Sequence, residues 1–403
     1  MKRILIRRVD NLGDMVLALP ALKALRNHFK ESHITLMVKQ EHKSLVKKYA
    51  DDFLAPLPLE NFDTLSKLYQ HCINIEYSFP SGYKPVVKNK LPRVFHIGTV
   101  DWNKPKHISK HIFDGLRAHG IKGTYSKSSI ELNSTAKQFA KTWFAKNKLS
   151  TTGNIIVSLD PNSGFEKKCW SIKGFLQVCK YLVEEFNCKI IIPVTAADNE
   201  KANYLLRNLP KGNCFLLQGQ LIDVVAILAK CDMHIGNDSG VGHLAAAVNT
   251  PTVSIFGPTD PLLWKPFGKK SVVVFKKEIE CPGGYEHAQL CKLQKCLVRI
   301  KPQDVIDGIL YCMTKYVDKE RFFSLVNLGV SKNLSIQKTH KGYVLANTET
   351  NHQCLIKRGW PQVKDVLNKI NKTPDSKIIP HKIPKHLHLI DMLMMHRIIE
   401  TVS

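Results

Sequence analysis

The feature that most constrains the fold of this chain is the 26-residue stretch His234–Thr259, HIGNDSGVGHLAAAVNTPTVSIFGPT. Its pattern predicts a strand end, a turn of Gly and small polar residues, a helix, a second strand and a Gly-Pro-Thr turn, which together form a unit of an α/β sheet. Asp238 and Ser239 are residue types that cap helices, and we expect them to cap the helix that carries Leu244. Since the first N–H groups of a helix can bind an anion, the stretch predicts either a phosphate-binding turn or an ordinary capped helix.

Two glycines and a histidine at the start of this helix fit the phosphate-binding alternative. Gly240 and Gly242 lack a Cβ, so we expect them to let a ligand approach the backbone closely. His243 lies one helical turn inside and offers a polar ring to the same ligand. Other parts of the chain must decide between the two alternatives.

Length, charge and cysteine content narrow the class of protein. A chain of 403 residues, 44% of them apolar, is expected to form two or three soluble domains. The net charge of +25 is spread along the chain and favours an anionic partner: nucleic acid, an acidic membrane surface or a phosphorylated substrate. The eleven cysteines fit reduced thiols better than a disulfide scaffold. Without an 18-residue apolar run or a secretory signal, we expect a cytoplasmic protein.

The rest of the chain alternates between strand and helix patterns. Residues 4–9 are predicted as a strand, 10–14 as a polar turn, 15–29 as a helix and 34–38 as a strand. A second series follows a linker at 149–154, with strands predicted at 155–159, 189–194, 214–218 and 271–275, and helices at 172–186, 199–209, 221–229 and 302–317. This α/β pattern predicts two doubly wound domains, residues 1–150 and 151–318, that face a cleft.

Three charged residues lie where loops leave the predicted strands. Ligands in parallel sheets bind at the carboxyl ends of the strands, so Asp14 can reach the cleft and act as a general base. Capping of the following helix is an alternative of equal weight, and Asp10 is a weaker candidate of the same kind. Lys168, close to Trp170, can neutralise phosphate charge on a leaving group, with a solvated surface lysine as the alternative.

Several other classes of protein fit poorly. No G-x-G-x-x-G follows the first strand, which disfavours a dinucleotide-dependent oxidoreductase, and neither a P-loop nor a nucleophile elbow occurs. Cys281, Cys291 and Cys296 lack C-x-x-C spacing, so ordinary thiols are favoured over a zinc site. The basic residues form no recognised nucleic-acid-binding module, so nucleic acid is not the expected partner.

Five motifs in order resemble the lipopolysaccharide heptosyltransferases of glycosyltransferase family 9. They are Asn11-Leu12-Gly13-Asp14, Leu19-Pro20-Ala21-Leu22, Lys168-Cys169-Trp170, Asn237-Asp238-Ser239-Gly240 with His243-Leu244-Ala245-Ala246-Ala247, and Phe256-Gly257-Pro258-Thr259-Asp260. The resemblance covers about residues 1–315 and implies a GT-B fold, with two Rossmann-like domains that hold acceptor and sugar nucleotide across a central cleft. It implies transfer of heptose from ADP-heptose to the inner core of lipopolysaccharide, with inversion and without a required metal or other cofactor.

The resemblance also implies roles for individual residues. Asp14 matches the general base that deprotonates the acceptor hydroxyl, with Asp10, Asn11 and Gly13 beside the acceptor. Lys168 matches the lysine on the donor diphosphate. The remaining donor-binding positions would be Ser163 and Gly164 on the phosphate turn, Asp238, Ser239, Gly240 and His243 at the phosphates and sugar, Asp198 or Glu200 at the ribose, and Gly219 near the adenine. Alternatives are an enzyme of the same fold that uses another nucleotide sugar, and a nucleotide-sugar-binding relative without transfer activity.

The surplus of positive charge suits an anionic lipopolysaccharide acceptor, and it allows a peripheral contact with the inner face of the cytoplasmic membrane. Residues 319–403 exceed what the resemblance covers and form a small basic C-terminal extension. A contact with a membrane surface or a partner is one interpretation of this extension. The favoured one is packing of its apolar residues on the second domain.

Overall fold

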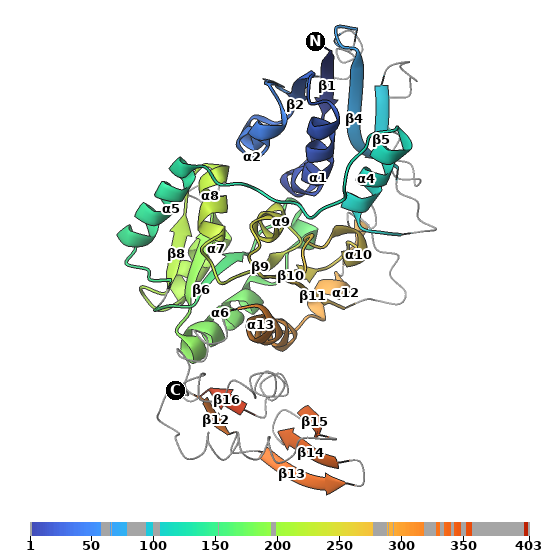
Figure 1. Cartoon of the computed structure of the whole chain (residues 1–403). Helices are drawn as coiled ribbons and strands as arrows, with labels where there is room; N and C mark the ends of the chain where they lie inside the picture. The colour runs from blue at the N-terminus through green and yellow to red at the C-terminus, as the bar shows by residue number, and fades with distance from the viewer. Residues whose placement is uncertain are drawn as a thin grey trace.

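The computed structural model describes most of the first 317 residues and five short strands beyond them. The described residues are 2–57, 65, 67–78, 94–99, 105–151, 153–194, 199–276, 288, 290–292, 294–317, 328–330, 334–339, 342–347, 352–356 and 399–401. Two parallel sheets with their helices form two α/β units, one above the other in Figure 1. This arrangement confirms the predicted α/β class with two Rossmann-like units.

The first unit contains a five-stranded sheet in the order β3-β2-β1-β4-β5, in which each strand is parallel to its neighbours. Alternate residues of the central strand are buried on opposite faces: Ile4 and Ile6 pack with the main core, and Leu5 packs in a separate cluster with Tyr69. Burial on both faces is typical of a parallel sheet. The strands are β1 (Arg3–Arg7), β2 (His33–Met37), β3 (Asp52–Leu54), β4 (His71–Ser78) and β5 (Val94–Thr99), and the helices are α1 (Leu12–His28), α2 (Lys43–Val46) and α4 (Ile108–Ala118).

The second unit contains a six-stranded parallel sheet in the order β11-β10-β9-β6-β7-β8. Its strands are β6 (Ile156–Asp160), β7 (Lys189–Pro193), β8 (Cys214–Leu217), β9 (Met233–Asn237), β10 (Thr252–Phe256) and β11 (Ser271–Phe275). Strands β6, β9 and β10 are buried along their whole length. The helices are α6 (Ile172–Phe186), α7 (Glu200–Asn208), α8 (Leu221–Leu228), α9 (Gly240–Ala247), α10 (Pro261–Trp264), α12 (Lys295–Val298) and α13 (Pro302–Tyr316).

Side-chain caps define the starts of several helices. Ser171 accepts the N–H of Gly174 at the start of α6, and Asn199 accepts the N–H of Ala202 at the start of α7. Asn187 adopts a left-handed conformation with φ of 49° and ends α6. These signals explain why the predicted range 172–186 coincides with α6.

The predicted polar turn at residues 10–14 is wrong. Helix α1 begins at Leu12, so Asp14 is its third residue and lies in the first helical turn. The N-cap residue Asn11 makes no side-chain hydrogen bond to the helix within the described part of the chain. Asp14 therefore lies inside α1 and is not its N-cap, and the helix begins about one turn earlier than the sequence pattern indicated.

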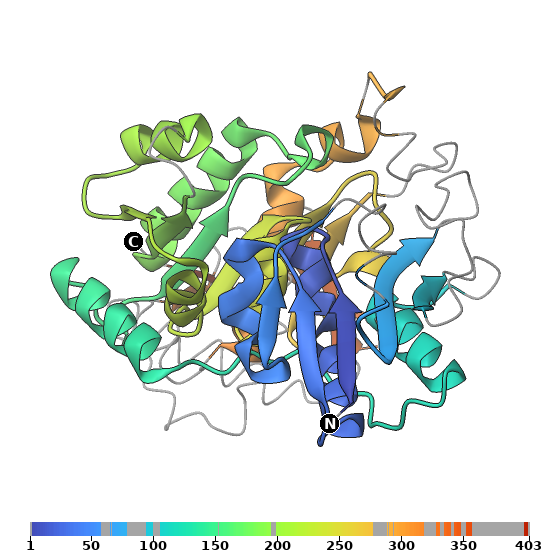
Figure 2. The ribbon, with the colours of Figure 1, turned by 90° about the horizontal axis from the view of Figure 1, so that it is seen from above.

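Helix α1 of the first unit packs against α9 of the second (Figures 1 and 2). A Cβ at Gly240 would lie 2.8 Å from both Cβ and Cγ of Leu12, and a Cβ at Gly13 would lie 2.9 Å from Cδ2 of His243. The position that a Cβ of Gly240 would occupy is filled by the side chain of Leu12. The glycines thus allow two helix N-termini to approach closely.

The segment between α4 and α5 (Ser134–Lys146) contacts both units. The hydroxyl of Ser128 donates to the carbonyl of Val16 at 2.7 Å, and the N–H of Ile130 donates to the carbonyl of Ala247 at 3.3 Å. Helix α5 packs on α8 (Figure 1), although it precedes residue 150. We retain the domain division 1–150, 151–318 and 319–403 as a proposal.

The described part of the C-terminal extension consists of antiparallel strands. β12 (Leu328–Val330) pairs with β16 (Ile399–Thr401), and β14 (Gly342–Asn347) lies between β13 (Leu334–Thr339) and β15 (His352–Ile356). Most of the stretch 387–402 lies outside the described residues. No helix in the described ranges combines the length and the apolar character required to cross a bilayer.

Candidate active site at the junction of the two units

The candidate site lies where the first turn of α1 meets three loops of the second sheet. These loops follow the carboxyl ends of β6, β9 and β10, and α1 follows the carboxyl end of β1. The carboxyl edge of a parallel sheet is where ligands of such folds bind. The two units therefore present their ligand-binding edges to one junction, at the centre of Figure 1.

The carboxylate of Asp238 connects the loops of the second unit. Lys168 Nζ donates to Asp238 Oδ2 at 2.9 Å, and the hydroxyl of Thr259 donates to the same oxygen at 2.8 Å. The hydroxyl of Ser163 donates to the backbone carbonyl of Asp238 at 2.8 Å. The side chains of Lys168 and Asp238 are only 19% and 7% exposed, so this ion pair is largely shielded from water. Thr259 is a member of the site that the sequence reasoning placed only in a turn.

Ser239 and Asp238 do not cap α9, which corrects the prediction from the sequence. Ser239 occupies the N-cap position, but its hydroxyl donates to Asp160 Oδ2 at 2.8 Å, and the carboxylate of Asp238 faces Lys168. Asp160 also accepts the N–H of Asn162, and burial raises the pKa of its carboxyl. The first N–H groups of α9 therefore have no side-chain cap within the described residues, which favours the anion-binding alternative.

The loop that carries Lys168 is anchored by the residue two positions later. The backbone N–H of Trp170 donates to Asn237 Oδ1 at 2.9 Å, and its indole N–H donates to the carbonyl of Ile300 at 2.9 Å. Gly174 leaves room for the indole, since a Cβ there would lie 2.6 Å from Cζ2 of Trp170. Lys168 is thus held by a buried aromatic anchor next to Asp238.

Asp14 approaches the same place from the first unit. Burial is the largest influence on its carboxyl and raises the pKa from 3.8 to about 6, and Arg8 opposes this shift. Asp10 raises the pKa further, Lys168 lowers it and Asp238 raises it. Two charged residues of the second unit therefore influence the pKa of Asp14. Asp14, the predicted base, and Lys168, the residue predicted to bind the diphosphate, belong to one site. A carboxyl with a pKa of about 6 is ionised at neutral pH and is well matched to accept a proton.

Arg8 is a member of this site that the sequence reasoning missed. Its residue surface is completely buried. Its guanidinium donates to the carbonyl of Asp14 at 2.7 Å and to the carbonyl of Ile75 at 2.9 Å, and it pairs with Asp10 Oδ2 at 2.6 Å. The available signal was the pair Arg7-Arg8 that follows the apolar run Ile4–Ile6, because a charge at the end of a buried strand needs partners.

His243 packs on the first turn of α1, where its ring lies against Gly13. Burial lowers the pKa of His243 to about 4, so the imidazole is neutral at physiological pH. Its Nδ1 is buried and has no hydrogen-bond partner within the described part of the chain. A buried polar atom without a partner is a position that a bound ligand can satisfy.

The other predicted residues lie around this centre or away from it. Asp10 is engaged by Arg8, and Asn11 accepts a long hydrogen bond of 3.4 Å from Lys39. A Cβ at Gly164 would meet no atom within 4 Å, so this turn borders open space. Gly219 follows the edge strand β8 and lies beside Phe139 of α5. Asp198 lies outside the described residues, and Glu200 begins α7.

The structure identifies no metal centre within its described residues: no three His, Cys, Asp or Glu side chains there gather as metal ligands. Cys291 and Cys296 are partly buried cysteines. Cys281, the third cysteine of the zinc alternative, lies outside the described residues.

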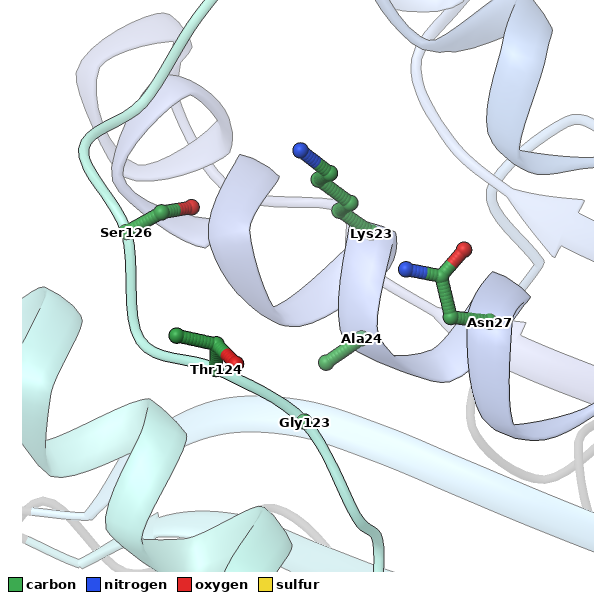
Figure 3. Close-up of a pocket in the computed structure, with 6 residues that line it drawn as sticks. All are labelled: Lys23, Ala24, Asn27, Gly123, Thr124 and Ser126. Atoms are coloured by element: carbon green, nitrogen blue, oxygen red, sulfur yellow. The ribbon is translucent and has the colours of Figure 1, made fainter.

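Two surface cavities lie along the second half of α1, away from Asp14. The larger, of about 350 Å³, is lined by Lys23, Ala24, Asn27, Gly123, Thr124 and Ser126 (Figure 3). The smaller, of about 190 Å³, shares Lys23 and Asn27 and adds Arg26, Lys48 and Tyr49. None of the predicted site residues lines either cavity, so the chemistry described above is not located there.

Known proteins similar to this chain are glycosyltransferases. The model of glycosyltransferase family 9 (heptosyltransferase) matches residues 100–294. Lipooligosaccharide heptosyltransferase 2 of Campylobacter jejuni is 23% identical over 318 residues, which cover 76% of this chain and 96% of that protein.

Among solved structures, a family 9 glycosyl transferase from Veillonella parvula matches with a TM-score of 0.64 and 18% identity, over 77% of this chain and 97% of that chain. The E. coli ADP-heptose lipopolysaccharide heptosyltransferase II matches with a TM-score of 0.58 and 20% identity, over 78% and 98%. These likenesses confirm the predicted GT-B arrangement of the two units. Taken with the family match and the order of the five motifs, they show that this chain is similar to the glycosyltransferases of family 9.

Proposed function

We propose that this enzyme transfers a heptose from ADP-heptose to the inner core of lipopolysaccharide, with Kdo or heptose as the acceptor sugar. The Campylobacter jejuni relative, a lipooligosaccharide heptosyltransferase, aligns over nearly its whole length. Heptosyltransferase is also the description of the family model that matches this chain. These names supply the substrate class of the proposal.

The observation that carries the proposed mechanism is the electrostatic contact between the two units. The pKa of Asp14, in α1, is lowered by Lys168 and raised by Asp238. These two residues come from different loops of the second unit. Sugar transfer from a nucleotide donor needs a base on one side of the anomeric carbon and charge stabilisation on the other. The junction of α1 and α9 offers one from each unit.

In the proposed reaction, the acceptor hydroxyl attacks the anomeric carbon while Asp14 accepts its proton. The bond from that carbon to the diphosphate oxygen breaks, and its electron pair leaves with ADP. Lys168 and the first N–H groups of α9 stabilise the negative charge that develops on the diphosphate. Since the nucleophile enters opposite the leaving group, one displacement inverts the configuration. No metal or other cofactor takes part in the proposed step.

The remaining site residues divide between donor and acceptor in this proposal. Asp10, Asn11 and Gly13 border the acceptor at the start of α1. On the donor side we place Ser163, Gly164, Asp198, Gly219, Asp238, Ser239, Gly240 and His243. Lys168 would be shared between the diphosphate and Asp238, which keeps the hydroxyl of Thr259 as a second donor.

We further propose that the enzyme acts in the cytoplasm, at the inner face of the membrane that carries its acceptor. The net charge of +25 supports this location, because it attracts both the phosphates and carboxylates of the acceptor and an anionic lipid surface. For the extension of residues 319–403 we retain packing on the second unit as the favoured role.

The test is a transfer assay read by mass spectrometry. The protein is incubated with ADP-heptose and truncated lipopolysaccharide acceptors that end in Kdo or in heptose, and UDP-glucose and UDP-N-acetylglucosamine serve as donor controls. We expect one acceptor class to gain the mass of a single heptosyl residue, with ADP-heptose only. A mass gain with one of the control donors, and none with ADP-heptose, would contradict the proposed donor.

A further inference from the structure

Arg8 is a buried cation of the first unit, and it donates a hydrogen bond to Asp14, the residue that we propose as the base. The guanidinium reaches the carbonyl of Asp14 in the first turn of α1, the carbonyl of Ile75 in β4 and the carboxylate of Asp10. The three groups belong to different parts of the first unit: Asp14 lies at the start of α1, Ile75 lies in β4, and Asp10 lies in the loop between β1 and α1. One side chain therefore fixes the position of the first turn of α1 relative to the sheet.

Such a buried guanidinium is costly unless its donors are satisfied. Transfer of an ion from water into the protein interior is strongly unfavourable, and only good geometry with hydrogen bonds offsets this cost. The neighbouring Arg7 is also buried, with 7% of its surface exposed, and donates to Asn74 Oδ1 at 3.1 Å. Arg7 therefore precedes Arg8 directly, at the end of β1, and its bond to Asn74 leads to β4.

We propose that Arg8 is a positioning residue for Asp14: it holds the first turn of α1 in place and keeps the Asp14 carboxylate in its ionised form for proton transfer. This inference rests on the proposed function of Asp14 as the general base. It adds that the reactivity of Asp14 depends on a cation buried behind it, in addition to the cation of the second unit.

The charges around Asp14 agree with this role. Arg8 and Asp10 face it from the first unit, and Lys168 and Asp238 face it from the second. Arg8 has the larger of the two influences that lower its pKa, while Asp10 partly cancels it. His243, which packs on Gly13, has a pKa of about 4 and is uncharged when Asp14 ionises.

The sign of the expected effect follows from these charges. Burial already raises the pKa of Asp14 to about 6, and loss of the Arg8 charge raises it further. At a given pH below the new pKa, each additional unit reduces the ionised fraction about tenfold. The acidic limb of kcat/KM therefore moves to higher pH, and activity returns in alkaline solution.

The experiment measures kcat/KM for transfer between about pH 5 and about pH 9.5 in Arg8→Met and Arg8→Lys. We expect the acidic limb of Arg8→Met to move up by about one pH unit or more, and that of Arg8→Lys, which keeps a cation, to move less. Asp10→Asn should move the limb in the opposite direction, because Asp10 raises the pKa of Asp14.

Arg7→Met is the matched control, because it removes a second buried arginine, one residue earlier. We expect it to lower the free energy of unfolding and to leave the acidic limb where it is. A loss of activity in Arg8→Met that is uniform across pH would overturn the proposal, as would an equal shift of the limb in Arg7→Met.

Asp14→Asn separates this inference from the proposed function. If Asp14→Asn retains transfer, the base assignment itself fails. If Asp14→Asn abolishes transfer while the limb of Arg8→Met stays in place, only the role of Arg8 is refuted.

Discussion

Asp14 carries its charge at an energetic cost. Burial favours the protonated form and raises the pKa of its carboxyl from 3.8 to about 6. A group whose pKa is raised by folding contributes stability that is complete below the unfolded pKa and is lost as the pH rises through the folded one. Asp14, the proposed base, therefore weakens the fold at neutral pH, as is often found for catalytic groups.

This cost predicts the stability of Asp14→Asn. Near pH 8, we expect the free energy of unfolding of the variant to be about 1–3 kcal/mol higher than that of the wild type. This gain in stability should shrink toward zero near pH 4. Urea titrations at several pH values measure it. Asp51→Asn serves as a control of opposite sign, because the N–H of Ile34 and then Arg26 lower the pKa of Asp51. A gain for Asp14→Asn that does not vary with pH would contradict the assigned cost.

The residue types of the site could be predicted from the sequence, but their partners could not. Asp14, Lys168 and Asp238 each follow a buried strand, and that position alone marks a ligand-binding edge. That Thr259 and Lys168 share one oxygen of Asp238 depends on how loops from different strands stack. The prediction that Ser239 caps α9 was wrong, because its hydroxyl donates to the buried carboxylate of Asp160 instead.

At the scale of elements, two helix N-termini meet at the site. Neither α1 nor α9 has a side-chain cap at its first turn in the described residues. Each N-terminus carries a partial positive charge, so their approach is unfavourable alone and favours an anion placed between them. Gly13 and Gly240 allow this approach, since a Cβ at either position would collide with the opposite helix.

We therefore expect Gly240→Ala to destabilise the protein by about 1–3 kcal/mol, because the new Cβ would lie 2.8 Å from Cβ and Cγ of Leu12, close to the backbone of α1. Gly164→Ala is the control, since its Cβ would meet no atom within 4 Å, and we expect its unfolding free energy to change by less than about 0.5 kcal/mol. Chemical denaturation compares the two. Equal effects would show that the contact of α1 with α9 adds nothing to stability.

Elements with strong local signals could be predicted, and those without them could not. Strand β11 and helix α6 have the predicted bounds, because continuous apolar runs and clear caps define them. The start of α1 was missed because Asn11, Gly13 and Asp14 are residue types that favour turns. Strand β3 has three residues and α2 has four, which is too short for a period to show.

At the scale of the whole molecule, the site exists only where the two units meet. The sequence pattern of each unit predicts its own sheet and its own carboxyl edge. It contains no signal for how the two edges dock, because that depends on the contact of Leu12 and Gly13 with α9. The family resemblance supplied the two-sided arrangement, and the contacts in the structure give it a physical basis.

We propose that the first unit activates the acceptor while the second unit holds the donor. The most direct test of this proposal measures heptose transfer and ADP affinity together in Asp14→Asn and Lys168→Ala. Lys167→Ala is the matched control, because the ammonium of Lys167 donates to the carbonyl of Cys291 and lies outside the site.

We predict that Asp14→Asn loses transfer by about 100-fold or more while its ADP affinity stays within about twofold of wild type. Lys168→Ala should lose transfer and bind ADP about tenfold more weakly or worse, as expected for a lost charge-assisted bond, while Lys167→Ala keeps both properties. Ordinary turnover by Asp14→Asn, or a loss of ADP affinity in Asp14→Asn as large as that in Lys168→Ala, would contradict the claim.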